Sequence, residues 1–328
     1  MDTDTKKRNV FIDNIQYFFF RLVTGIIRSC SLKTAYRLSE IVGFLFYLVD
    51  FKHRNRTIRH ILHSGICTDM KSAKRLARKN LTHLVKVFVE ITKFDQIVNE
   101  ENYAEHVRPA KDPISQKLLS HEGAIQTIVA TAHLGNWELA GSAFAFLSGI
   151  PMTSIMRPLG NPKIGEYFYR HRCSSNHKTV SREKGVRPLL VALKAGETVT
   201  IVSDQHANHR EGVEVEFFGH PARAHATPAL LHLKTGIPII TPYIVRVDED
   251  FHFELHCNEP FYYEQTEDHL ADVHAICQHF TTEIEKAVRA YPDQWLWAHR
   301  RWLDIERGHD NEYRNGKRIE PATTEKEK

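Results

Sequence analysis

The chain of 328 residues has few cysteines and lacks the spacings that build disulfide frameworks or zinc sites. Its five cysteines are dispersed and no two form a CxxC pair, which is typical of buried thiols in a reducing compartment. Histidine is plentiful, at 21 residues, but HExxH is absent, and clusters such as HANH lack the i, i+4 spacing with a third ligand that zinc hydrolases use. We therefore predict no metal site.

The sequence also lacks the marks of a secreted or conventional integral membrane protein. The N-terminus, MDTDTKKRNV, does not show the charged, apolar and small-residue pattern of a cleaved signal peptide. The longest stretch without Asp, Glu, Lys or Arg, residues 139–156, contains Gly141, Gly149 and Pro151, so we do not interpret it as a membrane span. The formal net charge of +4 is too small to indicate nucleic-acid binding by itself.

The N-terminal hundred residues are rich in apolar helical patterns followed by basic residues. Apolar side chains recur at helical spacing over residues 11–27, and Ser31 is positioned to cap a second helix that ends in IVGFLFYLV. Residues 51–79 hold nine Lys or Arg and one Asp, a net charge of +8. This combination suits an anionic membrane surface, although a helical subdomain with solvated basic faces is the alternative. We predict that residues 1–100 associate with a membrane, and both spanning and surface-bound arrangements stay open.

From about Gly123 the pattern changes to short β-rich runs that alternate with helical ones. This alternation predicts an α/β domain over residues 101–310, with a mixed central sheet flanked by helices, followed by a polar, disordered tail at 311–328. The expected elements are a strand at 124–132, a helix at 139–148, a strand at 152–156, a helix at 188–196, a strand at 197–204 and a helix at 228–236 that Gly236 ends.

The stretch TAHLGNWELAG places His133 and Glu138 five residues apart. On one helix these side chains would point roughly 140° apart, since a helix advances about 100° per residue. They could meet if His133 ended a strand and Glu138 stood in the first turn of the following helix. The carboxylate would then fix the imidazole tautomer while the other ring nitrogen took a proton from a nucleophile. The alternative is a structural histidine beside a glutamate that favours the helix dipole.

HLGNWE resembles the HX4D/E motif of glycerolipid-type acyltransferases, in the form carried by the lipid A biosynthesis acyltransferases. The resemblance continues in order through IMRPLGNPKIGEYFYRHR, VSDQHANHREGVEVEFFGHPARAHATPALLHLKTGIPIITPYIVR and YPDQWLWAHRRW, and it covers roughly residues 15–305. Several ordered blocks are far more specific than a single HX4E. The resemblance implies a glycerolipid acyltransferase-like fold.

The resemblance also implies a mechanism and a set of site residues. His133 would act as general base on an acceptor hydroxyl that attacks an acyl thioester directly, with Glu138 orienting the imidazole. The absence of GxSxG suits this direct transfer. Matching the later blocks gives functional roles to Arg170 and Asp204, for which a plain structural ion pair or cap is the alternative. The substrate-binding residues expected from this comparison are Arg170, Asp204, Arg157, Asn136 and Gln205.

The implied reaction moves a fatty acyl chain from acyl carrier protein or coenzyme A to a lipid hydroxyl, with a lipid A precursor as acceptor and no cofactor. It would take place at the cytoplasmic face of the inner membrane, without nucleic acid. The basic stretch at 157–187 fits a phosphate-bearing partner. The alternatives are another glycolipid or aminolipid acceptor, a hydrolase using the same dyad on water, and a non-catalytic lipid-binding protein.

Aromatic residues near the C-terminus have a packing interpretation and a ligand interpretation. In YPDQWLWAHRRW we expect Trp295 and Trp297 to pack in the core, with Arg300 and Arg301 facing solvent or phosphate. Phe217 and Phe218 could line an acyl groove or belong to an aromatic core, and the pattern does not separate these two alternatives.

Overall fold

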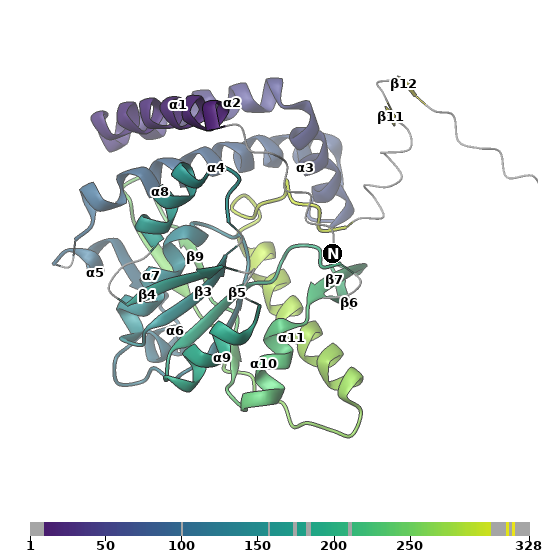
Figure 1. The fold of residues 1–328 in the computed structure, drawn as a ribbon. Helices are drawn as coiled ribbons and strands as arrows, with labels where there is room; N and C mark the ends of the chain where they lie inside the picture. Colours follow the sequence, from purple (N-terminus) through teal and green to yellow (C-terminus); the bar gives the residue numbers. More distant parts are fainter. Residues whose placement is uncertain are drawn as a thin grey trace, which may run out of the picture.

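A computed structural model describes residues 10–99, 101–156, 158–172, 176–181, 185–208 and 212–302, together with 313–314 and 317–318. The helices α1 (Val10–Ser29) and α2 (Leu32–Val49) lie across the long helix α4 (Met70–Ile97), and α3 (Phe51–His63) joins α2 to α4 (Figure 1). Below α4 lies the α/β part of the chain. The N-terminal helices therefore form a layer on top of α4.

Side-chain caps explain where the N-terminal helices begin. Ser31 caps α2 by accepting a hydrogen bond from the backbone N–H of Thr34 at 3.2 Å, as the sequence predicts. Asp50 and Asp69 cap α3 and α4 in the same way. Such a cap typically stabilises a helix by about 1 kcal/mol. The two helices capped by Ser31 and Asp50, α2 and α3, both pack against α4.

The central sheet has five strands, in the order β4-β3-β5-β2-β8, and every pairing is parallel. The strands are β2 (Ile128–Thr131), β3 (Met152–Met156), β4 (His177–Ser181), β5 (Thr198–Val202) and β8 (Ile239–Ile240). The helices between them are α7 (Trp137–Ser148), α8 (Pro162–Arg172), α9 (Arg187–Lys194) and α10 (Thr227–Thr235). The predicted α/β class is confirmed, and the expected alternation of strand and helix matches the chain within a few residues at each end.

Mixed pairing occurs in a second sheet, with the order β1-β10-β9. Its strands are β1 (Val107–Pro109), β9 (Tyr243–Arg246) and β10 (Phe253–His256); β1 pairs with β10 in parallel and β9 pairs with β10 antiparallel. The remaining elements are α5 (Tyr103–His106), α6 (Pro113–Leu118), the hairpin β6 (Gly212–Phe217) and β7 (His220–His225), α11 (His269–Ala290), and the pair β11 (Tyr313–Arg314) and β12 (Lys317–Arg318). β11 and β12 are the described part of the predicted tail.

Strand β2 is buried on both faces and joins two hydrophobic cores. Ile128 and Ala130 point into the core that α10, α11 and the C-terminal tryptophans complete. Val129 points into the opposite core, which contains side chains of α7 together with Tyr36 from α2 and Val89 from α4. Successive side chains of a strand alternate between faces, so a continuous apolar run is what a doubly covered parallel sheet requires. The N-terminal helices consequently share a core with the α/β part.

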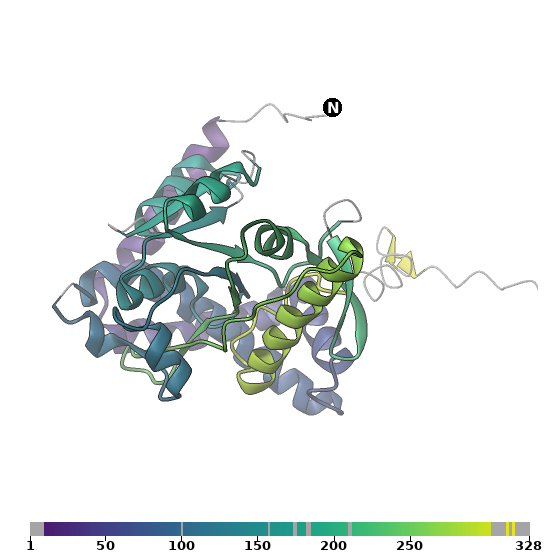
Figure 2. The ribbon, with the colours of Figure 1, turned by 90° about the horizontal axis from the view of Figure 1, so that it is seen from below.

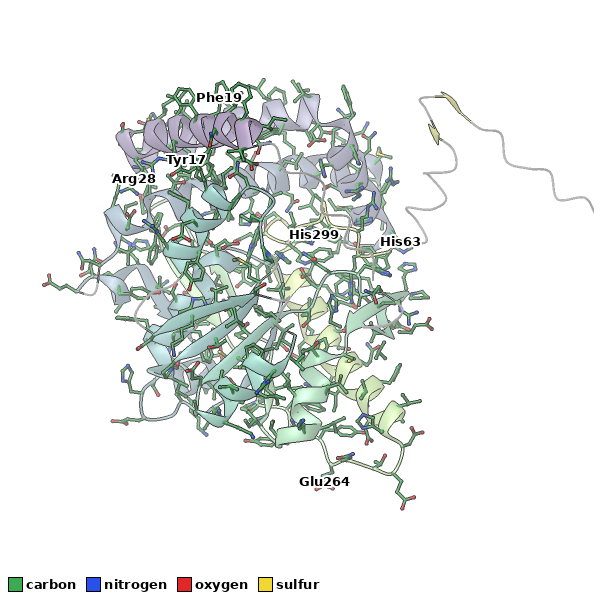
Figure 3. The ribbon with its side chains drawn as sticks, viewed as in Figure 1. Tyr17, Phe19, Arg28, His63, Glu264 and His299 are labelled. Carbon is green, nitrogen blue, oxygen red and sulfur yellow. The ribbon has the colours of Figure 1, made fainter. Side chains whose placement is uncertain are left out.

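Helix α1 leaves most of its apolar side chains exposed. Phe19 stands on the outer surface, away from the sheet (Figure 3). By length and composition α1 could cross a membrane. Its inner face packs on α8 (Figure 2). The centroids of the Phe20 and Tyr167 rings lie 4.9 Å apart at this contact. The exposed apolar residues of α1 and α2 are Val10, Phe11, Ile12, Ile15, Phe18, Phe19, Leu22, Val23, Ile26, Leu38, Ile41, Val42, Phe44, Leu45, Phe46, Leu48 and Val49.

Candidate active site

The loop between β2 and α7 brings His133 to the carboxyl end of the central sheet. As predicted, β2 ends at Thr131 and α7 begins at Trp137, so Glu138 stands in the first helical turn. Gly135 has φ +60°, and a Cβ built there would lie 1.6 Å from the carbonyl oxygen of Ile244. Glycine is therefore required on both conformational and steric grounds. The loop is pressed backbone to backbone against β9.

The orienting carboxylate of His133 belongs to Asp204, which follows the neighbouring strand β5. Asp204 accepts two hydrogen bonds from His133, one from the backbone N–H and one from ring Nδ1, each 2.8 Å long. It accepts a third bond from Nε1 of Trp295, also at 2.8 Å. Only 1% of Asp204 is exposed. Burial would raise the pKa of this carboxyl, but the contacts with His133 outweigh burial and hold the pKa well below its usual range.

This geometry fixes the tautomer of the neutral imidazole. An ionised carboxylate only accepts hydrogen bonds, so Nδ1 of His133 carries the proton and Nε2 presents a lone pair. Nε2 lies 3.4 Å from Nε2 of Gln205, an exposed residue directly after Asp204. An incoming hydroxyl could take the place of that weak contact. The arrangement is that of a general base with a fixed tautomer.

The expected partner, Glu138, contacts the ring that packs on His133. Its carboxylate accepts a hydrogen bond from Nε1 of Trp137 at 3.1 Å, and the Trp137 ring packs edge-on against His133 at 5.2 Å. The sequence predicted that Glu138 supplies the carboxylate that orients the imidazole. In the structure, Nδ1 of His133 instead donates its hydrogen bond to Asp204. The reason is that β2 and β5 are adjacent and parallel, so the residues that follow them meet at the same sheet edge.

The other predicted substrate ligands have different surroundings. Asn136 is buried: its side chain caps α7 by accepting from the Leu139 N–H at 3.3 Å, and its amide donates to Glu90 at 2.8 Å. Arg170 is 77% exposed on α8 and forms an ion pair with Glu166 at 2.8 Å. The ion pair of Arg170 is thus with Glu166 of the same helix, and it does not connect Arg170 to His133. Arg157 lies outside the described residues.

A buried polar network supports the loop from α4, and sequence reasoning missed it. The carboxylate of Glu90, with none of its side chain exposed, accepts hydrogen bonds from Tyr36, Asn136 and Arg246. Burial would lower the pKa of Arg246, but Glu90 outweighs it, so the pKa is raised and the guanidinium stays charged. The network ties α2, α4 and β9 to the catalytic loop.

His83, also on α4, completes this support. Its Nε2 donates to the carbonyl oxygen of Gly135 at 3.3 Å, and Arg246 donates to its Nδ1 at 3.2 Å. Burial and the neighbouring Arg246 lower the pKa of His83 well below its usual value, so the ring is neutral at pH 7. A neutral ring can donate from one nitrogen and accept at the other, as both contacts require.

The C-terminal segment of the α/β part, residues 295–302, packs against the residues that hold His133. Trp295 and Trp297 are fully buried, as predicted. The prediction that Arg301 faces solvent or phosphate is wrong: its guanidinium is buried, donates to the carbonyl oxygens of Gln205 at 3.3 Å and Arg223 at 2.9 Å, and lies over the ring of Phe217. Burial lowers the pKa of Arg301 to about 10. The stem of this arginine fills space in an aromatic cluster.

Phe217 and Phe218 belong to that aromatic cluster. Phe217 is fully buried, with its ring 5.6 Å from Trp295 and 5.5 Å from Trp302. Phe218 contacts Trp297 and Trp302 at 6.2 Å. Of the two alternatives that the sequence left open, the structure therefore has these rings in the core.

A mostly apolar cavity of about 860 Å³ lies between the N-terminal helices and the catalytic segment. Its walls come from α1, α2 and α4, with Leu296, Ala298 and His299 contributing from the C-terminal segment. The centroid of the His299 ring lies 4.6 Å from that of His133. At this end of the cavity, the His299 ring is therefore adjacent to the imidazole of His133. The other lining residues are Val23, Ile26, Ile27, Cys30, Ala35, Leu38, Ser39, Val42, Phe46, Asp50, His53, Leu81, Leu84, Val85, Phe88 and Val89.

The fold and the site together define an α/β protein with a carboxylate-held histidine at the sheet edge and a lipid-sized apolar cavity beside it. The chain belongs to the bacterial lipid A biosynthesis acyltransferase family, whose family model matches residues 5–304. This match confirms the resemblance seen in the ordered sequence blocks.

Curated relatives match the chain over about half of its length and about half of their own. A phosphatidylinositol mannoside acyltransferase from Mycobacterium tuberculosis is 26% identical over 180 residues, 54% of each chain. The lipid A biosynthesis palmitoleoyltransferase of Escherichia coli K12 is 27% identical over 177 residues, covering 53% of this chain and 55% of that protein. The lauroyltransferase of the same organism is 25% identical over 187 residues, covering 55% and 57%.

Among solved structures, the 1-acyl-sn-glycerophosphate acyltransferase PlsC from Thermotoga maritima aligns with 78% of this chain and 98% of its own. The TM-score is 0.29 and the identity 14%, so this similarity carries no argument about function.

Proposed function

We propose that the protein transfers a fatty acyl chain from a thioester donor to a hydroxyl group of a lipid. The observation that supports this most strongly is the position of His133: a base of fixed tautomer stands one ring away from an apolar cavity of about 860 Å³. This volume lies within the usual range of ligand pockets, roughly 300–1,000 Å³. In this proposal the acyl chain lies in the cavity and its carbonyl group reaches the base.

The reaction needs no covalent intermediate on the enzyme. Nε2 of His133 takes the proton of the acceptor hydroxyl while the hydroxyl oxygen attacks the thioester carbonyl carbon. The new C–O bond forms, the C–S bond then breaks, and the leaving thiolate takes the proton from the imidazolium. Asp204 stabilises that imidazolium through Nδ1, and Gln205 meets the hydroxyl beside Nε2. We assign Glu138 a supporting role through the Trp137 ring.

Membership of the family supports a choice of donor and acceptor. We propose acyl carrier protein or coenzyme A as the thioester carrier and a lipid A precursor as the acceptor, with no cofactor. Arg170 is proposed for a phosphate of the acceptor, because its guanidinium is exposed on a helix that contacts α1 and α7. The match to phosphatidylinositol mannoside acyltransferases supports a second candidate, a mannosylated phosphatidylinositol-type glycolipid.

The protein would work at a membrane surface, at the cytoplasmic face of the inner membrane. Apolar side chains cover the outer faces of α1 and α2, and exposed cations follow on α3 and α4. Near anionic headgroups each such cation contributes on the order of 1 kcal/mol to binding. The exposed cations are Lys52, Lys71, Lys74, Arg75, Arg78 and Lys79.

The test combines purified protein, acyl carrier protein charged with labelled C12 to C16 chains, and a lipid A precursor in mixed micelles. Mass spectrometry of the lipid fraction should show one added acyl chain, and His133→Ala should remove it. The matched control is His274→Ala, which changes an exposed histidine of α11. Thioester consumption that yields only free fatty acid would indicate the hydrolase alternative, and unchanged transfer by His133→Ala would refute the mechanism.

A further inference from the structure

His299 lies between the catalytic base and the apolar cavity, and the described mechanism leaves it without a role. The centroid of its ring lies 4.6 Å from that of His133, with an interplanar angle of 63°, and His299 lines the cavity. A small group at this end of the cavity, against His299, would therefore lie about one ring away from the base.

Backbone hydrogen bonds fix His299 relative to His133. The N–H of Leu296 donates to the carbonyl oxygen of His133 at 3.0 Å. Nδ1 of His60 is 3.1 Å from the carbonyl oxygen of Trp297, and Arg56 donates to that of Ala298 at 3.1 Å. Helix α3 thus holds residues 297 and 298 directly, and the spacing between the two rings is built into the fold.

The surroundings of the two ring nitrogens of His299 determine its tautomer. Nδ1 is enclosed and has no hydrogen-bond partner among the described residues, and Nε2 is not one of these enclosed atoms without a partner. A buried N–H without an acceptor costs more free energy than a buried ring nitrogen without a donor. The proton of His299 is therefore on Nε2. Burial, reinforced by His133, lowers the pKa of His299 to about 4, so the ring is neutral at pH 7. His299 is consequently an uncharged donor whose N–H is at Nε2.

We propose that His299 is a catalytic residue that donates a hydrogen bond from Nε2 to the carbonyl oxygen of the acyl thioester. This inference rests on the proposed acyl transfer. With the chain in the cavity, the carbonyl oxygen lies at His299 and the carbonyl carbon faces the hydroxyl that His133 activates. When the C–O bond forms, the carbonyl electron pair moves onto oxygen and the hydrogen bond strengthens. When the C–S bond breaks, the pair returns and the thiolate takes the proton from His133.

Neutrality is the property that fits His299 to this task. His133 becomes an imidazolium during the step, and a second cation 4.6 Å away would oppose that change. A neutral donor stabilises the developing oxyanion without raising the cost of protonating the base. Removing one oxyanion donor typically lowers kcat by about 10²- to 10³-fold.

The test is the carbonyl stretching frequency of a bound, unreacted donor. The full chain carrying His133→Ala is mixed with dodecanoyl acyl carrier protein labelled with ¹³C at the thioester carbonyl, and the isotope-difference infrared spectrum is recorded. We expect a lower wavenumber in His133→Ala than in His133→Ala/His299→Phe, because the phenyl ring fills the space without donating. In the background with His133 intact, His299→Phe should lower kcat by about 10²-fold with little change in KM.

Two further outcomes separate this assignment from the proposed function. Donor that binds with the same frequency in both variants would overturn the role of His299 and leave the acyl transfer standing. Failure of both the acyl carrier protein thioester and the matching coenzyme A thioester to bind would overturn the transfer and this inference with it. His299→Gln keeps an N–H at a similar reach and should retain most of the shift and of kcat. A folded Gln variant as defective as the Phe variant would assign the loss to packing and overturn the proposal.

Discussion

His133 and Asp204 are 71 residues apart in the chain and are joined by two hydrogen bonds of 2.8 Å. One bond uses the backbone N–H of His133 and the other its ring, so a single carboxylate fixes both the position of the residue and the tautomer of the imidazole. Trp295 holds the carboxylate from the other side.

We expect Asp204→Asn to lower kcat by about 10³- to 10⁴-fold, because an amide favours the wrong tautomer of the base. Glu138→Gln should lower it by about tenfold or less, since Glu138 acts through Trp137. Steady-state transfer assays compare the two variants, with the exposed Asp250→Asn as control. If Glu138→Gln were the more damaging change, the carboxylate of the sequence motif would be the orienting group after all.

The buried pair of Glu90 and Arg246 should dominate the stability of the loop support. Glu90→Ala leaves a buried guanidinium without its carboxylate and should lower the free energy of unfolding by about 3–5 kcal/mol. Glu249→Ala breaks an ion pair with Lys86. Because the side chain of Glu249 is 61% exposed, this change should lower the free energy of unfolding by about 1 kcal/mol or less. Urea unfolding followed by circular dichroism compares them. Equal losses would contradict a buried role for Glu90.

Acid should destabilise the protein partly through His299. The unfolded chain binds a proton at this residue below pH 6.5, whereas the folded chain binds it only below about 4. The contribution of the neutral ring is therefore complete above pH 6.5 and is lost as the pH falls toward 4, by up to about 3 kcal/mol. His299→Phe should flatten this part of the stability curve, measured by urea unfolding between pH 4 and 7. An unchanged slope would show that other groups carry the effect.

Gly135→Ala should abolish transfer and destabilise the fold, because the new Cβ would overlap the carbonyl oxygen of Ile244 at 1.6 Å. Gly219→Ala is the matched control: its φ of +73° is equally unfavourable, but nothing lies within 4 Å of the added carbon. The control should cost about 1–2 kcal/mol and keep activity. Similar losses in both variants would mean that conformation, and not the close approach to β9, is what requires glycine at 135.

The local parts of the site could be predicted from the sequence, and the parts set by strand order could not. The spacing from AIQTIVATA to WELAG placed His133 at a strand end and Glu138 in a first helical turn, which the structure shows. The sequence motif favoured Glu138 as partner because it is near in the chain. The contact with Asp204 depends on β5 lying beside β2, and strand order is a property of the whole sheet.

The burial of charged residues was the other feature that the sequence did not predict. Glu90 and Arg301 look like ordinary surface charges, because nothing close to them in the sequence marks their partners. Glu90 meets Arg246, 156 residues away, and Arg301 meets the carbonyl oxygen of Arg223, 78 residues away. Helix periodicity detects apolar stripes, so a face that is buried through ion pairs and hydrogen bonds gives no signal of that kind.

The hydrogen bond between Trp295 and Asp204 places a fluorescent indole next to the carboxylate of the site. Trp295 donates its indole N–H to the carboxylate that holds the base, and Trp137 packs on the base itself. Indole emission responds to a nearby charge and to the exclusion of water. Donor binding and each change of proton at His133 should therefore register in the intrinsic fluorescence of the protein, without an added label. The catalytic cycle could then be followed in real time in a stopped-flow instrument.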